Sequence, residues 1–128
     1  IKLLQLSGIE VAVITARSTK SVAHRLKGLG VEHYYHGILD KSIALEKLIK
    51  KLSIDLSESA YVGDDVIDLP VMTRVALPIA VANAQESVKD HALMVTEKSG
   101  GNGAVREVCN FLLKSQDKYD ALVKSFLK

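Results

Sequence analysis

Short apolar runs alternate along the chain with amphipathic segments. Residues 10–15 read Glu-Val-Ala-Val-Ile-Thr, a β-branched and nearly unbroken apolar run. Such a run is typical of a strand buried on both faces of a parallel sheet. Similar runs predict further strands over residues 31–35, 60–63, 75–77 with 79–81 (one or two strands), and 93–96.

Between these runs, apolar residues recur at helical spacing. The clearest segment begins after Asp40, a suitable N-cap, and extends to about Leu52. In the helix before it, Ser18 is the expected cap and Gly30 the expected left-handed stop. Other helices are predicted over 2–6, 18–29, a short stretch after Asp65 interrupted by Pro70, 85–90, 104–114, and a last segment running to Lys128. The alternation predicts an α/β domain with a doubly wound, Rossmann-like, mainly parallel sheet.

Composition narrows the class of protein. With 128 residues and 48% hydrophobic residues, the chain can bury a core, and we expect one domain over 1–128 whose residues 100–128 form a glycine hinge and helical tail. The sole cysteine, Cys109, excludes an internal disulfide and is expected to be a buried thiol. The first residues read as the middle of a helix, so we expect the chain to be a fragment or to have lost its start.

Charge and hydropathy argue against two kinds of partner. A net charge of +2 is too small and too evenly spread to indicate nucleic acid. No apolar run approaches the roughly 18 residues that a membrane span needs. We therefore expect a cytoplasmic protein with neither a nucleic-acid nor a membrane partner.

Polar residues that suit phosphate chemistry follow the predicted strands. Thr15 ends one strand, Asp64 and Asp65 end another, and Lys41 begins a helix that should face the same edge. Adjacent carboxylates need a compensating cation, and hard oxygen ligands suit Mg²⁺. Asp68, one helical turn after Asp64, strengthens this metal hypothesis. The pattern indicates a site that positions and neutralises a phosphoryl group.

The acidic sequence and several nearby polar residues also have interpretations that involve no ligand. A Gly-Asp-Asp sequence after a strand is often only a turn, and Arg17 could be a solvated residue at a helix start. The four histidines show no metal-ligand spacing and are interpreted as surface or packing residues; they are His24, His33, His36 and His91.

Several motifs together resemble those of the haloacid dehalogenase superfamily. Val13-Ile14-Thr15 resembles its second motif, Lys41 its third, and Gly63-Asp64-Asp65-Val66-Ile67-Asp68 its fourth, GDDxxD. Three longer segments resemble the 3-deoxy-D-manno-octulosonate 8-phosphate phosphatase family of that superfamily: residues 9–17, residues 60–65, and residues 100–107, which read Gly-Gly-Asn-Gly-Ala-Val-Arg-Glu.

The resemblance implies a haloacid dehalogenase-like core without a cap domain, truncated at the N-terminus. It implies a Mg²⁺-dependent phosphomonoester hydrolase of lipopolysaccharide biosynthesis that acts on a small sugar acid phosphate. Asp64, Asp65 and Asp68 would hold Mg²⁺, and Thr15 and Lys41 would hold and neutralise the phosphoryl oxygens. It also implies a homotetramer in which a neighbouring subunit completes each site.

The substrate's carboxylate calls for bidentate donors, for which Arg17 and Arg106 are the candidates, with Lys20 one turn beyond Arg17. Ala16, in the same substrate loop, stands where the family commonly has Gly, a change we expect to be tolerated. The first motif, DxDGxxTDG, is absent. Its nucleophilic aspartate is expected on a strand before Ile1, so this chain should not turn over alone and is not expected to fold alone.

Three other hypotheses remain open. The substrate could be a nine-carbon sugar acid phosphate, or the chain could be a non-catalytic haloacid dehalogenase-like subunit that works by binding or assembly. A response-regulator receiver also gathers Asp, Thr and Lys around Mg²⁺, but there the acidic pair precedes the Thr and Lys along the chain, whereas here it follows them.

Overall fold

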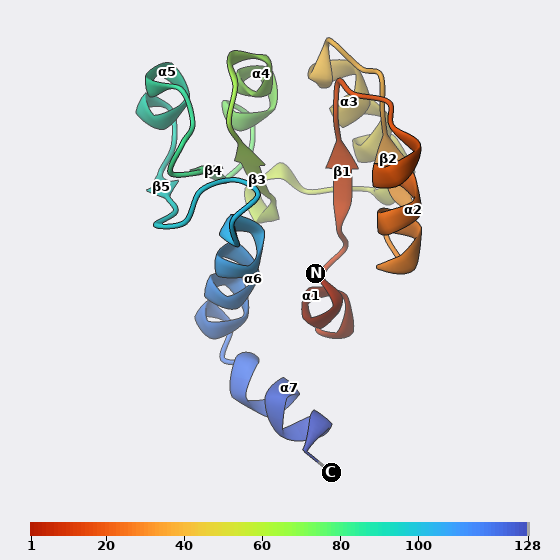
Figure 1. The fold of residues 1–128 in the computed structure, drawn as a ribbon, viewed down its shortest axis with the longest axis vertical. Coiled ribbons are helices and arrows are strands. Elements are labelled where there is room, and N and C mark those ends of the chain that lie inside the picture. The colour runs from red at the N-terminus through yellow and green to blue at the C-terminus, as the bar shows by residue number, and fades with distance from the viewer. Residues whose placement is uncertain (128) are drawn as a thin grey trace.

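The computed structural model describes residues 1–127 and alternates helices with short strands (Figure 1). The strands are β1 (Ala12–Ile14), β2 (His33–Tyr35), β3 (Ala60–Gly63), β4 (Leu77–Ala80) and β5 (Met94–Val95). The helices are α1 (Lys2–Leu6), α2 (Lys20–Gly28), α3 (Lys41–Leu52), α4 (Leu69–Met72), α5 (Glu86–Asp90), α6 (Ala104–Ser115) and α7 (Tyr119–Phe126). Two 3-10 turns, η1 (Leu56–Glu58) and η2 (Val66–Asp68), flank β3. The predicted α/β class with parallel strands is confirmed.

Side-chain caps fix the two helices that precede the site. Asp40 caps α3 as predicted, because its carboxylate accepts from the amide of Ser42 at 3.1 Å. The predicted cap of α2 is wrong by one residue: Thr19 accepts from the amide of Val22, whereas Ser18 pairs with the ring of His36. The left-handed stop predicted at Gly30, where φ is +73°, is confirmed.

Two helices differ in detail from the sequence prediction, and one of two predicted strand arrangements is observed. Pro70 lies in the first turn of α4, where its missing amide hydrogen costs no hydrogen bond, so it starts the helix and does not interrupt it. Residues 75–81 give the single strand β4, in which the Pro78 carbonyl accepts from Leu93 at 2.9 Å. The last helix ends at Phe126, and Lys128 lies outside the described residues.

The strands form two parallel sheets, although a single sheet was predicted. In one sheet β1 pairs with β2, with Ala12 opposite His33; in the other the order is β3-β4-β5. Figure 1, which looks down the shortest axis of the molecule, shows β1 and β3 as the inner strands, both pointing to the same end. Among the described residues, each inner strand is paired along one edge only.

The two sheets differ in how deeply their residues are buried. The core of the larger sheet surrounds β4, where Ile79 and Ala80 are fully buried and Ala80 packs with Met72 and Val88 from the neighbouring helices. In contrast, Ala12 of β1 is exposed and Val13 is only half-buried. The prediction that residues 10–15 are buried on both faces is therefore wrong for the described chain, because the small two-stranded sheet of β1 and β2 is not fully covered on its faces.

A second cluster joins the two ends of the chain. Leu4 of α1 packs against Cys109 and Leu113 of α6. Cys109 is 5% exposed, which confirms the predicted buried thiol. Within residues 1–127, no helix has both the length and the apolar character that crossing a bilayer requires.

Candidate active site

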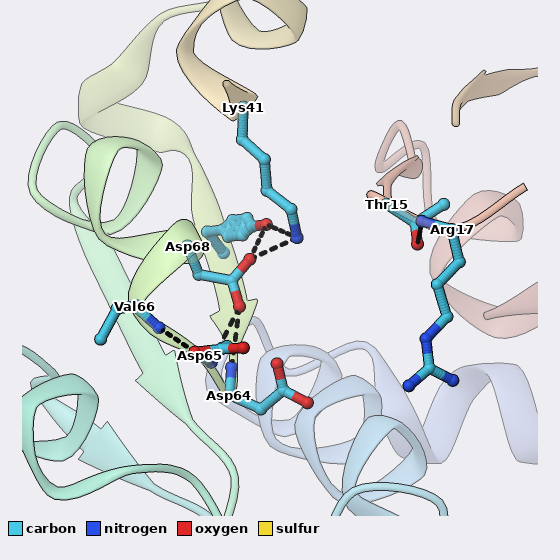
Figure 2. Close-up of polar contacts among 8 residues, drawn as sticks. Thr15, Arg17, Lys41, Asp64, Asp65, Val66 and Asp68 are labelled. Atoms are coloured by element: carbon cyan, nitrogen blue, oxygen red, sulfur yellow. Dashed lines mark hydrogen bonds and ion pairs between the residues drawn. The ribbon is translucent and has the colours of Figure 1, made fainter. Parts of the chain in front are cut away.

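Two predicted site residues lie at the C-terminal ends of strands, and a third lies at the N-terminal start of a helix. Thr15 directly follows β1, Asp64 directly follows β3, and Lys41 is the first residue of α3. Figure 2 shows Lys41, Asp64 and Asp68 on one side of the site and Thr15 with Arg17 on the other. This placement agrees with the rule that ligands bind beyond the carboxyl ends of parallel strands.

A buried ion pair fixes the Lys41 side chain. Its Nζ lies 2.6 Å from Oδ1 of Asp68, and the two residues are only 7% and 2% exposed. The same Asp68 oxygen accepts from the Tyr61 hydroxyl at 2.6 Å, and Lys41 Nζ lies 3.4 Å from that hydroxyl. Lys41 is therefore held by α3 and by two groups of the β3–η2 segment.

The second oxygen of Asp68 shapes the loop after β3. Oδ2 accepts from the amides of Asp64 and Asp65 at 3.0 and 3.2 Å (Figure 2). Burial alone would raise the pKa of Asp68, but the hydrogen bonds from Lys41, Tyr61 and the two amides outweigh it and hold the pKa below its usual value. Asp68 is thus a buried anion that organises both Lys41 and the Asp64-Asp65 turn.

Tyr61 remains a neutral donor in this cluster. Burial, followed by its hydrogen bond to Asp68 and the negative charges of Asp68 and Asp64, raises the pKa of its phenol far above the usual value.

Asp65 caps the turn that follows it. Its Oδ1 accepts from the amide of Val66 at 2.6 Å and from the side-chain amide of Gln85 at 3.0 Å. The Gln85 contact ties η2 to the start of α5, and the Asp65 side chain also accepts from the Asp68 backbone amide in a capping box.

Asp64 carries the excess negative charge of the site. Asp64 is exposed as a residue, but partial burial of its carboxylate, followed by the charge of Asp68, raises its pKa above the usual value. A carboxylate in this position is stabilised by an added cation, and a hard divalent ion such as Mg²⁺ fits its oxygen donors.

The three predicted metal ligands are not equivalent. Asp64 presents its carboxylate to the site, Asp65 uses one oxygen as a cap, and both oxygens of Asp68 are occupied. Among residues 1–127, no three His, Cys, Asp or Glu side chains are gathered in a metal-binding arrangement. The structure thus fits a cation at Asp64, with Asp65 as the second donor, better than a set of three carboxylates.

The residues predicted to bind substrate lie partly together. Thr15 Oγ1 accepts from the amide of Arg17 at 3.1 Å, which turns the chain after β1 and leaves the Arg17 side chain exposed (Figure 2). Ala16, between them, is half-buried, and Lys20 is exposed at the start of α2.

Arg106 lies elsewhere on the described chain. It is exposed on α6 and lines a groove of about 450 Å³ with Lys98, Phe111 and Lys114. Thr15, Lys41 and Asp64 do not line this groove.

Sequence reasoning missed Tyr61 and Gln85. The alternation of side chains along a strand places Tyr61 on the same face as Gly63, and Gly63 packs directly against Asp68. A Cβ at Gly63 would lie 2.8 Å from the Asp68 Cβ and 2.7 Å from the Met72 sulfur. The strand pattern therefore contained a signal for Tyr61, whereas nothing local in the sequence pointed to Gln85.

Known proteins resemble this chain in sequence. A family model described as haloacid dehalogenase-like hydrolase matches residues 35–108. The 3-deoxy-D-manno-octulosonate 8-phosphate phosphatase of Escherichia coli (strain K12) is 50% identical over 114 residues, which are 89% of this chain and 61% of that protein. The chain thus spans about three fifths of the length of this curated relative.

Solved structures agree in fold. The crystal structure of 3-deoxy-D-manno-octulosonate 8-phosphate phosphatase from Moraxella catarrhalis, in complex with magnesium ion, phosphate ion and KDO, is similar with a TM-score of 0.93 and 45% identity; the match covers 98% of this chain and 72% of that one. The enzyme of the same name from Yersinia pestis gives a TM-score of 0.91 at 44% identity and covers 93% and 64%.

Proposed function

Because the chain belongs to the haloacid dehalogenase-like hydrolases, and within them to the 3-deoxy-D-manno-octulosonate 8-phosphate phosphatase family, we propose that it forms the greater part of a Mg²⁺-dependent phosphomonoester hydrolase. The substrate in this proposal is 3-deoxy-D-manno-octulosonate 8-phosphate, an intermediate of lipopolysaccharide biosynthesis. The observation that carries the proposal is the placement of Thr15 and Asp64 at the C-terminal ends of β1 and β3, and of Lys41 at the N-terminus of α3.

Lys41 and Thr15 act on the phosphoryl group. The Lys41 ammonium is held in place by its buried partner Asp68 and neutralises phosphoryl oxygens as negative charge builds in the transition state. The Thr15 hydroxyl accepts from the Arg17 amide, and its own proton is free to be donated to a phosphoryl oxygen.

Asp64, with Asp65, would hold the magnesium ion. A Mg²⁺ ion bound there supplies charge neutralisation and orients phosphoryl oxygens. This chain contributes the exposed Asp64 carboxylate, the Asp65 carboxylate at the start of η2, and the Asp68 hydrogen bonds that keep the turn in place.

The nucleophile in this proposal is an aspartate outside these 128 residues, which forms an aspartyl-phosphate that water then hydrolyses. The open edges of β1 and β3 support the proposal, since each inner strand still has backbone donors and acceptors without a strand partner in the described chain. A parallel strand between them would carry its last side chains to the edge where Thr15 and Asp64 lie.

The sugar end of the substrate is assigned by its chemistry. Arg17 and Lys20, beside Ala16, are the donors for the substrate's carboxylate within the chain. Arg106, on a separate groove, would serve the site of a neighbouring subunit in a homotetramer. The tetramer and a cytoplasmic location are parts of the proposal that the family resemblance supports.

The proposal is tested by joining the nucleophile-bearing strand of the Escherichia coli relative to this chain and measuring phosphate release. We expect release from 3-deoxy-D-manno-octulosonate 8-phosphate that requires Mg²⁺ and falls at least about a hundredfold in Asp64→Asn, since one preorganised charge contact is worth that much. Asp90→Asn, an exposed change of the same charge on α5, is the matched control.

Each other outcome has a distinct meaning. Release only from a nine-carbon sugar acid phosphate would replace the substrate and keep the reaction. A folded chimera that releases no phosphate from either ester would favour a non-catalytic binding subunit. Release by the 128-residue chain alone would place the nucleophile inside it.

A further inference from the structure

Tyr61 makes contacts that no motif accounts for. Its hydroxyl, projected from β3, lies 2.6 Å from Asp68 Oδ1 and 3.4 Å from Lys41 Nζ. Lys41 and Asp68 are 2.6 Å apart and both are buried. The three groups form a closed triangle in which each side is a polar contact.

The chemistry of the groups decides the direction of each bond. A carboxylate only accepts and an ammonium only donates, whereas a phenol does both. The Tyr61 proton therefore goes to Asp68, and the phenol lone pair faces the ammonium of Lys41. Two of the three ammonium donors are engaged in this way, which leaves one to point out of the triangle.

This arrangement restrains a flexible side chain. A lysine has a four-carbon stem with about 2 kcal/mol of rotamer entropy, and a single carboxylate would allow the ammonium to swing about one contact. Tyr61 adds a second fixed point, since its own position is set by β3 and by only two rotatable bonds.

We propose that Tyr61 is a positioning residue that aims the free donor of the Lys41 ammonium at the phosphoryl oxygen. The inference rests on the proposed function for the identity of the anion, but the triangle itself stands without it. Its contribution is orientation, because Asp68 remains the ionic partner of Lys41 when the phenol is removed.

The test compares Tyr61→Phe, which removes one oxygen atom, with Tyr34→Phe, whose ring stacks on His36 at 5.0 Å and is not part of the triangle. In the 128-residue chain we expect a slowly exchanging ¹⁵N–ammonium NMR signal for Lys41 in the wild type and in Tyr34→Phe. Tyr61→Phe should lose that signal and, with Mg²⁺ present, should bind inorganic phosphate roughly tenfold more weakly. Mg²⁺ affinity measured without phosphate should stay unchanged.

The NMR readout separates failure of this inference from failure of the proposed function. If the Lys41 signal depends on Tyr61 but the chain binds no phosphate, the positioning role of Tyr61 stands and phosphate as the proposed anion is overturned. An unchanged signal and unchanged phosphate affinity in Tyr61→Phe overturn the inference and leave the function standing. If Tyr61→Phe does not fold, the wild-type chain provides the test. We expect a nuclear Overhauser effect between the Lys41 ammonium and the Tyr61 ring, and its absence overturns the positioning role.

Discussion

Asp68 receives donors on both of its oxygens, two from side chains and two from backbone amides. An asparagine has the same shape but only one accepting oxygen, so Asp68→Asn would turn an NH₂ group toward either the Lys41 ammonium or the amides of Asp64 and Asp65. Removing one partner of a buried pair leaves the other charge without compensation, and we expect a loss of about 3–5 kcal/mol in the free energy of unfolding.

Urea unfolding followed by circular dichroism measures this loss. The exposed Asp90→Asn change is the control and should lie within about 0.5 kcal/mol of the wild type. A similar small effect for Asp68→Asn would contradict the ion pair as the structure draws it.

Gly63 is required for packing beneath the site. An added Cβ would meet the Met72 sulfur at 2.7 Å and the Asp68 Cβ at 2.8 Å. Met72 can adjust, but Asp68 is held by its hydrogen bonds, so Gly63→Ala should destabilise the protein by about 1–3 kcal/mol. Gly28→Ala is the matched control, because nothing lies within 4 Å of its added Cβ and its helical position favours alanine by about 0.5–1 kcal/mol.

Thermal unfolding of the two alanine variants checks this contrast. The expected order of melting temperatures places Gly28→Ala at or above the wild type and Gly63→Ala below it. Equal melting temperatures for the two variants would show that the space around Gly63 relaxes freely.

The residue types of the site could be predicted from sequence, but their partners could not. Thr15, Lys41 and Asp64 follow from strand ends and helix starts, which are local features. That Asp68 would turn to Lys41 depends on the packing of α4 against α3, two elements whose contact no local pattern specifies. The pairing of Asp65 with Gln85 depends on tertiary placement in the same way.

At the scale of the element, the Glu107 carboxylate of α6 binds the loop before the helix. Glu107 accepts from the amides of Glu97 and Lys98 at 2.9 and 3.0 Å. These backbone hydrogen bonds, with the nearby charge of Lys98, lower the pKa of Glu107 below its usual value of 4.5. A lowered folded-state pKa means that the ionised form stabilises the fold above about pH 4.5, and that this stabilisation is lost as the pH falls through the folded-state pKa.

Glu107→Gln should therefore lower the melting temperature at neutral pH, and the difference from the wild type should shrink as the pH falls below 4.5. Differential scanning calorimetry between pH 3 and pH 7 measures it, with the exposed Glu58→Gln as control. A difference that does not vary with pH would mean that the Glu107 hydrogen bonds do not need its charge.

Helices and strands were predicted well where their signals are local. The Asp40 cap and the Gly30 stop each depend on one side chain or one backbone angle, and both are confirmed. The Ser18 cap was misplaced because Thr19, next to it, offers the same hydroxyl, and the contact between Ser18 and His36 across 18 residues decides between them. Pro70 was misinterpreted because a proline suits the first turn of a helix as well as a break.

At the scale of the molecule, the sequence pattern predicted parallel strands but not their division into two sheets. Alternation of helices and strands favours pairing between consecutive strands, but it does not indicate where one sheet ends and another begins. The apolar run of β1 is the pattern of a strand buried on both faces, while the structure leaves Ala12 exposed and pairs β1 along one edge only. That mismatch between a fully apolar sequence and a half-exposed strand is the strongest whole-molecule support for a further strand between β1 and β3.

Hydrogen–deuterium exchange tests this arrangement across the whole described chain. Strand β4 pairs on both edges and contains fully buried residues, so its amides should exchange most slowly. The inner strands β1 and β3 pair on one edge each, so we expect amides on their open edges to exchange at least about tenfold faster than those of β4. Joining the nucleophile-bearing strand of the Escherichia coli relative should slow exchange in β1 and β3 and leave β4 unchanged, because only the inner edges gain a partner. Equal protection of all strands in the 128-residue chain would contradict the open edges, and an added strand that protects β2 or β5 instead would place it at the outside of the molecule.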